Sequence, residues 1–185
     1  YFSYGIKKNL YDKLRGKNVD EILKNIEVYS SKYAKTIRQI LEAKNKNTFV
    51  YSEFVQGSGA ILFGLLLELV GFENANGTET TKGLRYAILT DMTVTKLNLI
   101  KIKNRFNQSD NMFGDYIQVI IGSGIVTEGF SLNNVQEEHI LTPFWNYTPI
   151  SQAMARGLRV GSHNDLIKAG VKPVVNIYQH VSMIN

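Results

Sequence analysis

The sequence has no cysteine, only three prolines in 185 residues, and no apolar run long enough to cross a bilayer. Without thiols, the chain forms neither a disulfide scaffold nor a zinc ribbon. Its longest apolar run, at residues 60–70, is interrupted by Gly64 and Glu68, whereas a membrane-spanning helix needs roughly 20 apolar residues. No apolar leader segment follows Lys7 and Lys8. We therefore expect an intracellular protein without a membrane partner.

Several common motifs of catalysis and nucleotide binding are also missing. The segments Gly57–Gly59 and Gly122–Gly124 lack the third glycine of a dinucleotide-binding fingerprint, and no Gly-x-x-x-x-Gly-Lys-Ser/Thr occurs. The Gly-x-Ser-x-Gly elbow of a serine hydrolase is absent. Zinc-ligand spacing is absent among the three histidines, which are His139, His163 and His180. By itself, the chain is therefore expected to form no P-loop, no serine hydrolase site and no metal site.

Basic residues are concentrated at the start of the chain. The whole sequence has 21 Lys and Arg and 16 Asp and Glu, a net charge of +5. Residues 1–50 contain 11 of the basic and five of the acidic residues, so the rest of the chain is close to neutral. A basic flank on a near-neutral body is compatible with a polyanionic partner. The same lysines can equally lie on the solvated face of a helix, and the sequence leaves both interpretations open.

Apolar residues alternate between helical and strand spacing along the chain. Their spacing predicts two short helices within residues 6–26, broken near Gly16, and further helices at about residues 30–43, 60–69, 90–106 and 150–158. Ser30 or Ser31 can cap the helix at 30–43, and its predicted buried stripe is Tyr33, Ala34, Ile37, Ile40 and Leu41. Short apolar runs predict strands at residues 48–52, 85–89, 116–121, 139–142 and 174–178. Apolar strands that alternate with helices are typical of a parallel sheet covered on both sides. We therefore predict an α/β fold with a mostly parallel, twisted sheet, helices on both of its faces and an N-terminal helical extension.

Ligands of a parallel sheet bind beyond the carboxyl ends of its strands, so chemistry is expected after strand ends such as Ser52. A further candidate lies near the predicted helix at 150–158, where Gln152, Arg156 and Arg159 are spaced i, i+4 and i+7. Residues at this spacing share one face of a helix. Two guanidinium groups and an amide on one face suit the binding of a phosphate chain. A solvated or salt-bridged helix face has the same spacing, so the pattern alone leaves that alternative open.

Four segments resemble segments of superfamily 2 helicases and translocases, and they occur in the same order as in that family. The pattern Gln-x-x-x-Arg-x-x-Arg that begins at Gln152 is that of motif VI. Residues 123–132, Ser-Gly-Ile-Val-Thr-Glu-Gly-Phe-Ser-Leu, resemble motif V, and residues 48–54 resemble motif IV. Residues 134–146, with a His-Ile strand and a Trp-Asn pair, resemble the link between motifs V and VI in the poxvirus-type and giant-virus branch. Over about residues 30–180, the chain is therefore similar to the C-terminal RecA-like lobe of such an enzyme.

The resemblance implies roles for individual residues. In the family, two motif VI arginines reach the γ-phosphate of ATP across a cleft between two lobes, and the matching catalytic candidates are Arg156 and Arg159. The matched nucleotide-binding positions are Gln152, Glu128 and Gly129. The matched nucleic-acid-binding positions are Ser123 and Gly124 in motif V and Ser52 and Glu53 in motif IV. Residues 1–29 are expected to be a helical extension or interlobe segment, and residues 30–185 the lobe itself.

The resemblance implies the C-terminal lobe of an ATP-dependent nucleic-acid helicase that is inactive without its N-terminal lobe. Because the chain begins with Tyr1, we expect it to be part of a longer protein, whose N-terminal lobe binds most of the ATP and Mg²⁺. DNA or RNA is the expected partner, and viral transcription machinery is a further candidate. The expected location of such a viral protein is the virion or the host cytoplasm.

Two alternatives stay open. One is a transcription-associated DNA translocase that does not unwind its substrate. It is favoured by Ala153, which stands where many helicases have Arg and which the resemblance shares with Swi/Snf-type translocases. The other is a non-catalytic nucleic-acid-binding domain of the same fold.

Overall fold

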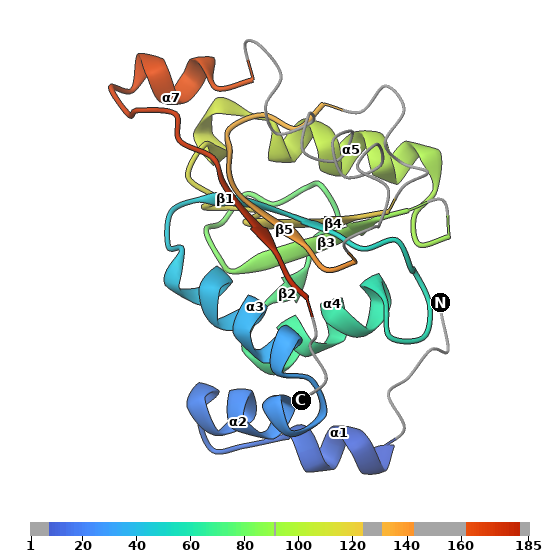
Figure 1. Ribbon diagram of the computed structural model, residues 1–185. Coiled ribbons are helices and arrows are strands. Elements are labelled where there is room, and N and C mark those ends of the chain that lie inside the picture. The colour runs from blue at the N-terminus through green and yellow to red at the C-terminus, as the bar shows by residue number, and fades with distance from the viewer. Residues whose placement is uncertain (1–7, 91, 124–130, 143–161, 182–185) are drawn as a thin grey trace.

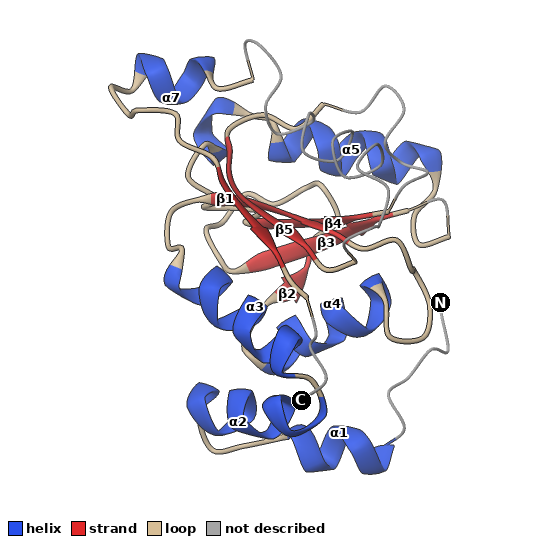
Figure 2. Cartoon of the chain, in the orientation of Figure 1, coloured by secondary structure: helices blue, strands red, loops and turns tan. Residues whose placement is uncertain are grey.

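A computed structural model describes residues 8–90, 92–123, 131–142 and 162–181 of the chain. These residues form a six-stranded sheet with the order β2-β3-β4-β1-β5-β6, in which every pair of neighbouring described strands is parallel (Figure 2). The strands are β1 (Asn47–Tyr51), β2 (Glu73–Asn74), β3 (Arg85–Leu89), β4 (Val119–Gly122), β5 (Val135–Ile140) and β6 (Asn176–Gln179). The predicted α/β class, with a mostly parallel sheet, is confirmed.

Helices cover both faces of the sheet (Figure 1). Their bounds are α1 (Lys8–Leu14), α2 (Val19–Tyr29), α3 (Ser31–Glu42), α4 (Ala60–Leu69), α5 (Lys96–Phe106), the 3₁₀ turn η1 (Ser109–Asn111) and α7 (Asn164–Lys168). Helices α3 and α4 lie on one face and α5 on the other, while α1 and α2 form an outer layer against α3. Buried apolar side chains form one cluster between the sheet and α3 and α4, and a second between the sheet and α5. The predicted position of helices on both faces of the sheet is therefore confirmed.

Local sequence explains where α3 begins and which side it buries. Ser30 has extended backbone, and its hydroxyl accepts a hydrogen bond from the Tyr33 amide at 3.2 Å. This contact satisfies one of the free amides of the first helical turn. The predicted apolar stripe lies in the core, where four of its members are buried: Tyr33, Ala34, Ile37 and Ile40. The predicted cap and buried stripe of this helix are therefore confirmed.

Strand β4 begins later than its apolar pattern at 116–121 predicts. The fully buried Asn111 accepts hydrogen bonds from the amides of Tyr116 and Ile117 at 2.9 and 3.0 Å. Its side-chain amide also donates to the Ile117 carbonyl at 3.0 Å. These backbone groups are not available to a neighbouring strand, and β4 begins at Val119.

Strand β5 begins earlier than predicted, at Val135 instead of residue 139, and it includes the polar residues Gln136–Glu138. Glu137 is buried there because Lys46 Nζ lies 2.8 Å from its Oε1. The Asn176 side-chain amide donates to the same oxygen at 3.1 Å. Two partners that are distant in the sequence thus allow a carboxylate inside the sheet, and an apolar pattern does not indicate them.

The N-terminal helices pack onto the rest of the fold. Leu14 and Ile26 belong to the same buried cluster as Phe63 of α4. The division of the chain between residues 29 and 30 stays a prediction. Of the helices in the described ranges, none combines the length and the apolar character that crossing a bilayer requires.

Candidate functional site

The carboxyl ends of β4, β1 and β5 meet in the middle of the sheet. The chain first builds β2, β3 and β4 on one side of β1 and then crosses to β5 and β6 on the other. Such a switch in strand order opens a crevice beyond the strand ends, where ligands of parallel sheets bind. The register aligns Tyr51 of β1 with Gly122 and with Ile140, so the next residues of all three strands are neighbours. We call these next residues the strand-end site: Ser52, Glu53, Ser123, Leu141 and Thr142.

Ser52 and Glu53 leave β1 with their backbone held from both sides. The Ser52 amide donates to the Gly122 carbonyl at 3.0 Å, and the Ser52 hydroxyl donates to the Phe54 carbonyl at 2.8 Å. The Glu53 amide donates to the Thr142 hydroxyl at 2.7 Å. Ser52 is buried and Glu53 is exposed. The structure therefore brings both motif IV candidates to the site, although the Ser52 hydroxyl already has a partner.

Ser123 lies beside Ser52, directly after β4. The residue is 2% exposed, and its hydroxyl has no hydrogen-bond partner among the described residues. A buried hydroxyl that lacks a partner costs roughly 1–3 kcal/mol, so this group has an unused capacity to donate or accept. Of the two described candidate serines, Ser123 is the one whose hydroxyl has no partner among the described residues.

The loop that follows β1 is packed tightly against α3 and α4. The Tyr33 hydroxyl donates to the Ser58 carbonyl, and burial raises the pKa of Tyr33, which keeps its hydroxyl a donor. The Phe54 carbonyl accepts from the Ala60 amide at 2.9 Å. A Cβ at Gly59 would lie 2.0 Å from the Phe54 carbonyl oxygen, so the close approach requires glycine. This loop therefore gives Ser52 and Glu53 a rigid support.

Glu138 of β5 is a buried carboxyl group. The residue is 0% exposed, and within the described ranges neither carboxyl oxygen has a hydrogen-bond partner. Burial raises the pKa of Glu138 to about 8, so the group is mostly protonated at pH 7. A protonated carboxyl group neither attracts a metal ion nor brings negative charge to the site.

His139 and His180 form a buried pair at β5 and β6. Nδ1 of His139 lies 3.0 Å from Nε2 of His180, and the two rings are stacked with centroids 5.3 Å apart. Burial, with His180 as a second cause, lowers the pKa of His139 to about 3. Burial, with Lys35 and Lys32 as further causes, lowers the pKa of His180 to about 4. Both rings are therefore neutral at pH 7, and one ring donates to the other.

Six predicted site residues lie outside the described part of the chain: Gly124, Glu128, Gly129, Gln152, Arg156 and Arg159. The predicted helix at 150–158 lies there too. Their roles stay predictions. Within the described ranges, no group of three His, Cys, Asp or Glu side chains is arranged to hold a metal ion. The strand-end site has one carboxylate, that of Glu53, which is too few for a divalent cation, whereas the Ser123 hydroxyl can donate to a phosphate oxygen.

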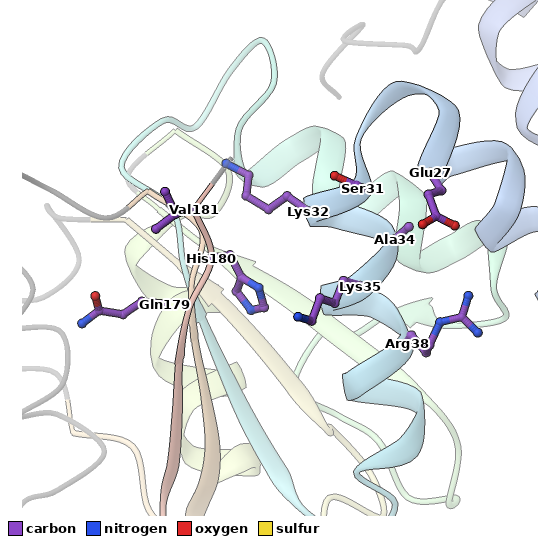
Figure 3. Close-up of a pocket in the computed structure, with 9 residues that line it drawn as sticks. All are labelled: Glu27, Ser31, Lys32, Ala34, Lys35, Arg38, Gln179, His180 and Val181. Atoms are coloured by element: carbon purple, nitrogen blue, oxygen red, sulfur yellow. The ribbon is translucent and has the colours of Figure 1, made fainter. Parts of the chain in front are cut away.

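A basic pocket that no pattern of the sequence predicts lies beside α3. This pocket, which we call the α3 pocket, has a volume of about 540 Å³ and lies between α2, α3 and the end of β6 (Figure 3). Its cations are Lys32, Lys35 and Arg38. Their spacing along the predicted helix indicates that they lie on one side of it. No local pattern indicates that β6 lies opposite them.

The proteins to which this chain is similar include two viral proteins, and a solved structure also matches it. The chain is 44% identical over 177 residues to "Putative helicase 087L" of Invertebrate iridescent virus 3, covering 94% of this chain and 18% of that protein. It is 31% identical over 185 residues to "Putative ATP-dependent RNA helicase" of Heliothis virescens ascovirus 3e, covering 95% of this chain and 19% of that protein. The chain thus spans under a fifth of the length of these relatives. The crystal structure of the C-terminal part of the Fun30 ATPase domain matches 80% of this chain and 40% of that one, with 18% identity and a TM-score of 0.49. No family model matches the chain.

Proposed function

The chain is a homologue of one segment of the helicases of iridovirus and ascovirus type, and on that premise we propose that it is the C-terminal lobe of an ATP-dependent nucleic-acid helicase. In this role it binds the nucleic-acid backbone and completes an ATP site that an N-terminal lobe provides. The observation that carries the proposal is the meeting of Ser52 and Ser123, predicted from two separate motifs, at adjacent strand ends of one parallel sheet.

The chemistry of the strand-end site supports contact with a phosphate backbone. The unpartnered hydroxyl of Ser123 can donate to a phosphate oxygen, and such contacts position a strand without reading its sequence. The Glu53 carboxylate is negative and repels phosphate, so its part is limited to accepting hydrogen bonds from sugar hydroxyls or base amino groups. Ser52 acts through its backbone, which holds the turn in place, since its hydroxyl is occupied.

For the nucleotide, the proposal rests on the motif VI residues of the sequence. Arg156 and Arg159 would bind γ-phosphate oxygens and offset the negative charge that develops during transfer. Gln152, Glu128 and Gly129 are the proposed nucleotide contacts of this lobe. ATP and Mg²⁺ would be bound mainly by the N-terminal lobe, so hydrolysis requires both lobes to close on each other.

Turnover of ATP by the full-length protein tests this proposal. Arg156→Ala and Arg159→Ala should each lower turnover on the order of 10³-fold, because each removes a cation from the transition state. Arg15→Ala, which removes an exposed arginine from the N-terminal helices, is the matched control and should leave turnover unchanged. Unchanged turnover in the two motif VI variants would favour the non-catalytic alternative. ATP hydrolysis by the isolated 185 residues would contradict the two-lobe site.

The translocase alternative differs from a helicase in one activity, because a translocase moves along its nucleic acid without separating the strands. Ala153 favours this alternative, because the resemblance shares this residue with Swi/Snf-type translocases. An ATP-dependent strand-displacement assay beside an ATP-dependent translocation assay separates the two. Movement without displacement of the complementary strand would replace the helicase assignment by the translocase one.

A further inference from the structure

Three cations from one helix line the α3 pocket. Lys32, Lys35 and Arg38 are spaced three positions apart along α3, and residues at this spacing lie on one side of a helix. In Figure 3, Lys35 and the ring of His180, which follows β6, point toward each other across the pocket. Glu27 of α2 is the acidic residue among the described lining.

The positive charge of this pocket is not neutralised within the described chain. The ion pairs between described residues all lie elsewhere, and neither Lys35 nor Arg38 takes part in one. Both side chains are exposed. His180 adds no charge at pH 7, because burial and the nearby lysines hold its pKa at about 4. Three cations therefore face one carboxylate, and the excess is positive.

The pocket adjoins the strand-end site. Lys32 Nζ donates to the Leu141 carbonyl at 2.9 Å, while the Leu141 amide donates to the Tyr51 carbonyl at 2.9 Å. The next residue, Thr142, accepts from the Glu53 amide. One short segment after β5 thus contacts both α3 and the turn after β1. A ligand that extends beyond the strand-end site on this side reaches Lys32 first.

The lining favours phosphates over bases. Its described residues include no Phe, Tyr or Trp, and the ring of His180 is already stacked on His139. A base therefore finds no free aromatic surface on which to stack. Lysine and arginine side chains in an open pocket suit the phosphodiester groups of a strand, which present negative charge at regular intervals.

We propose that the α3 pocket binds the phosphodiester backbone of the same nucleic-acid strand that contacts the strand-end site. Lys35 and Arg38 bind the phosphates, and Lys32 connects the two sites through the Leu141 carbonyl. Binding is independent of base sequence. This inference rests on the proposed function, because it extends the contact of that lobe with its nucleic acid.

The experiment measures binding of a fluorescein-labelled single-stranded oligonucleotide to the full-length protein by fluorescence anisotropy, without nucleotide. The double variant Lys35→Gln, Arg38→Gln removes two charges without adding any. We expect a loss of affinity on the order of tenfold at low salt, and a decrease of about 1.4 in the slope of log affinity against log salt. Lys96→Gln, Lys101→Gln is the matched control, because these exposed lysines lie on α5 across the sheet.

The outcomes separate the inference from the proposed function. If the wild-type protein binds no strand, the proposed function fails. If it binds and the double variant binds like the α5 control, the inference fails alone. A lowered unfolding midpoint of the double variant would make the cations structural and would also overturn the inference.

A second arm distinguishes a strand from a free phosphate. Low millimolar inorganic pyrophosphate should displace the oligonucleotide no better than a salt of the same ionic strength. Strong displacement by pyrophosphate that disappears in the double variant would assign the pocket to a free phosphate compound and overturn the backbone assignment.

Discussion

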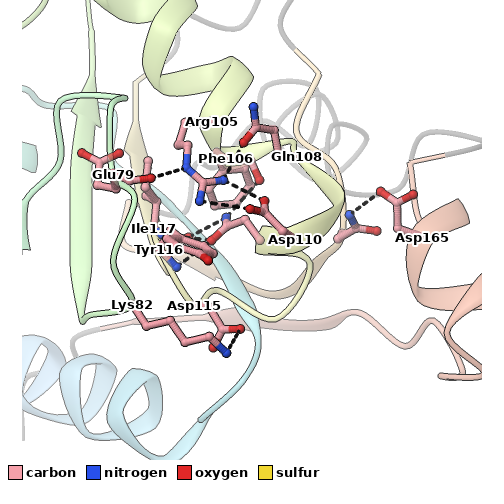
Figure 4. Close-up of polar contacts among 12 residues, drawn as sticks. Glu79, Lys82, Arg105, Phe106, Gln108, Asp110, Asp115, Tyr116, Ile117 and Asp165 are labelled. Atoms are coloured by element: carbon pink, nitrogen blue, oxygen red, sulfur yellow. Dashed lines mark hydrogen bonds and ion pairs between the residues drawn. The ribbon is translucent and has the colours of Figure 1, made fainter.

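Arg105 and the cations of the α3 pocket lie on opposite faces of the sheet and differ in how far neighbouring residues neutralise their charge. Arg105 of α5 is 7% exposed, and its guanidinium group has hydrogen-bond partners in three residues (Figure 4). Its guanidinium donates to the Glu79 carbonyl at 2.7 Å, to Gln108 at 2.7 Å and to Asp110 at 2.8 Å. The same group lies 3.9 Å from the ring centroid of Tyr116. These hydrogen bonds all go to residues of its own chain, at Glu79 and in the segment that follows α5.

The cations of the α3 pocket present the opposite case. Lys35 and Arg38 are exposed and form no ion pair with described residues. A neutralised, buried cation stabilises the loops that it joins, whereas an unneutralised one in an open pocket leaves its charge to a ligand. The comparison teaches that pairing and burial, more than residue type, separate structural from binding cations in this chain.

The largest expected effect tests the structural side of this comparison. Arg105→Met should lower the free energy of unfolding by about 1–3 kcal/mol, because it removes the hydrogen bonds of a buried guanidinium group and leaves the Glu79 carbonyl without its donor. Urea denaturation measures the loss. Arg105→Lys keeps the charge but not the planar fork, so it should recover only part of the stability. A loss below about 0.5 kcal/mol in the Met variant would show that the network does not hold the loops.

Glu138 is a buried carboxyl group without a described hydrogen-bond partner, and it tests the effect of burial without pairing. The pKa of Glu138 rises from an ordinary 4.5 to about 8 through burial. Between these values the folded state binds one more proton than the unfolded state, so stability falls as the pH rises through this range. Wild-type protein should therefore lose more than about 1 kcal/mol relative to Glu138→Gln between pH 5 and pH 8. Equal pH profiles of the two proteins would contradict a protonated Glu138, and exposed Glu42→Gln is the control.

The two serines of the strand-end site differ in the same sense. Ser52→Ala removes the hydrogen bond to the Phe54 carbonyl and should cost about 1 kcal/mol. Ser123→Ala removes a buried hydroxyl that has no partner among the described residues, so it should leave the free energy of unfolding unchanged or raise it. Chemical denaturation of both variants gives the comparison. Equal losses would mean that the Ser123 hydroxyl has a partner in the folded chain.

The smallest expected effect belongs to the α3 pocket. Lys35→Gln and Arg38→Gln should each change the free energy of unfolding by less than about 0.5 kcal/mol, since they break no ion pair between described residues. The double variant should even gain slightly at low salt, because like charges at this spacing repel. Thermal unfolding at two salt concentrations measures both. A clear destabilisation would place these cations with Arg105.

Local patterns predicted much of the fold. Helix α4 spans the predicted residues 60–69, and α3 is capped by Ser30, one of the two predicted caps, because helical periodicity and capping depend on residues within one or two turns. The start of β4 was wrong because Asn111 binds the backbone of a segment that looks like a strand. The early polar half of β5 was missed because Glu137 depends on Lys46 and Asn176.

For the site, the sequence predicted which strand ends matter but not how their groups are used. Ser52 and Ser123 follow apolar strands, and the parallel register makes them neighbours. Their difference, one hydroxyl bonded and the other without a partner, depends on the turn after β1. The α3 pocket exists because β6 brings His180 opposite Lys35.

The sequence by itself determined the order of helices and strands, their apolar faces and the strand ends at which ligands of a parallel sheet bind. These properties follow from periodicity and from residues a few positions apart. Only the tertiary structure decided which charges are neutralised, which buried groups lack partners and where cations gather. Desolvation and pairing depend on neighbours within a few ångströms, and folding supplies those neighbours from distant parts of the chain.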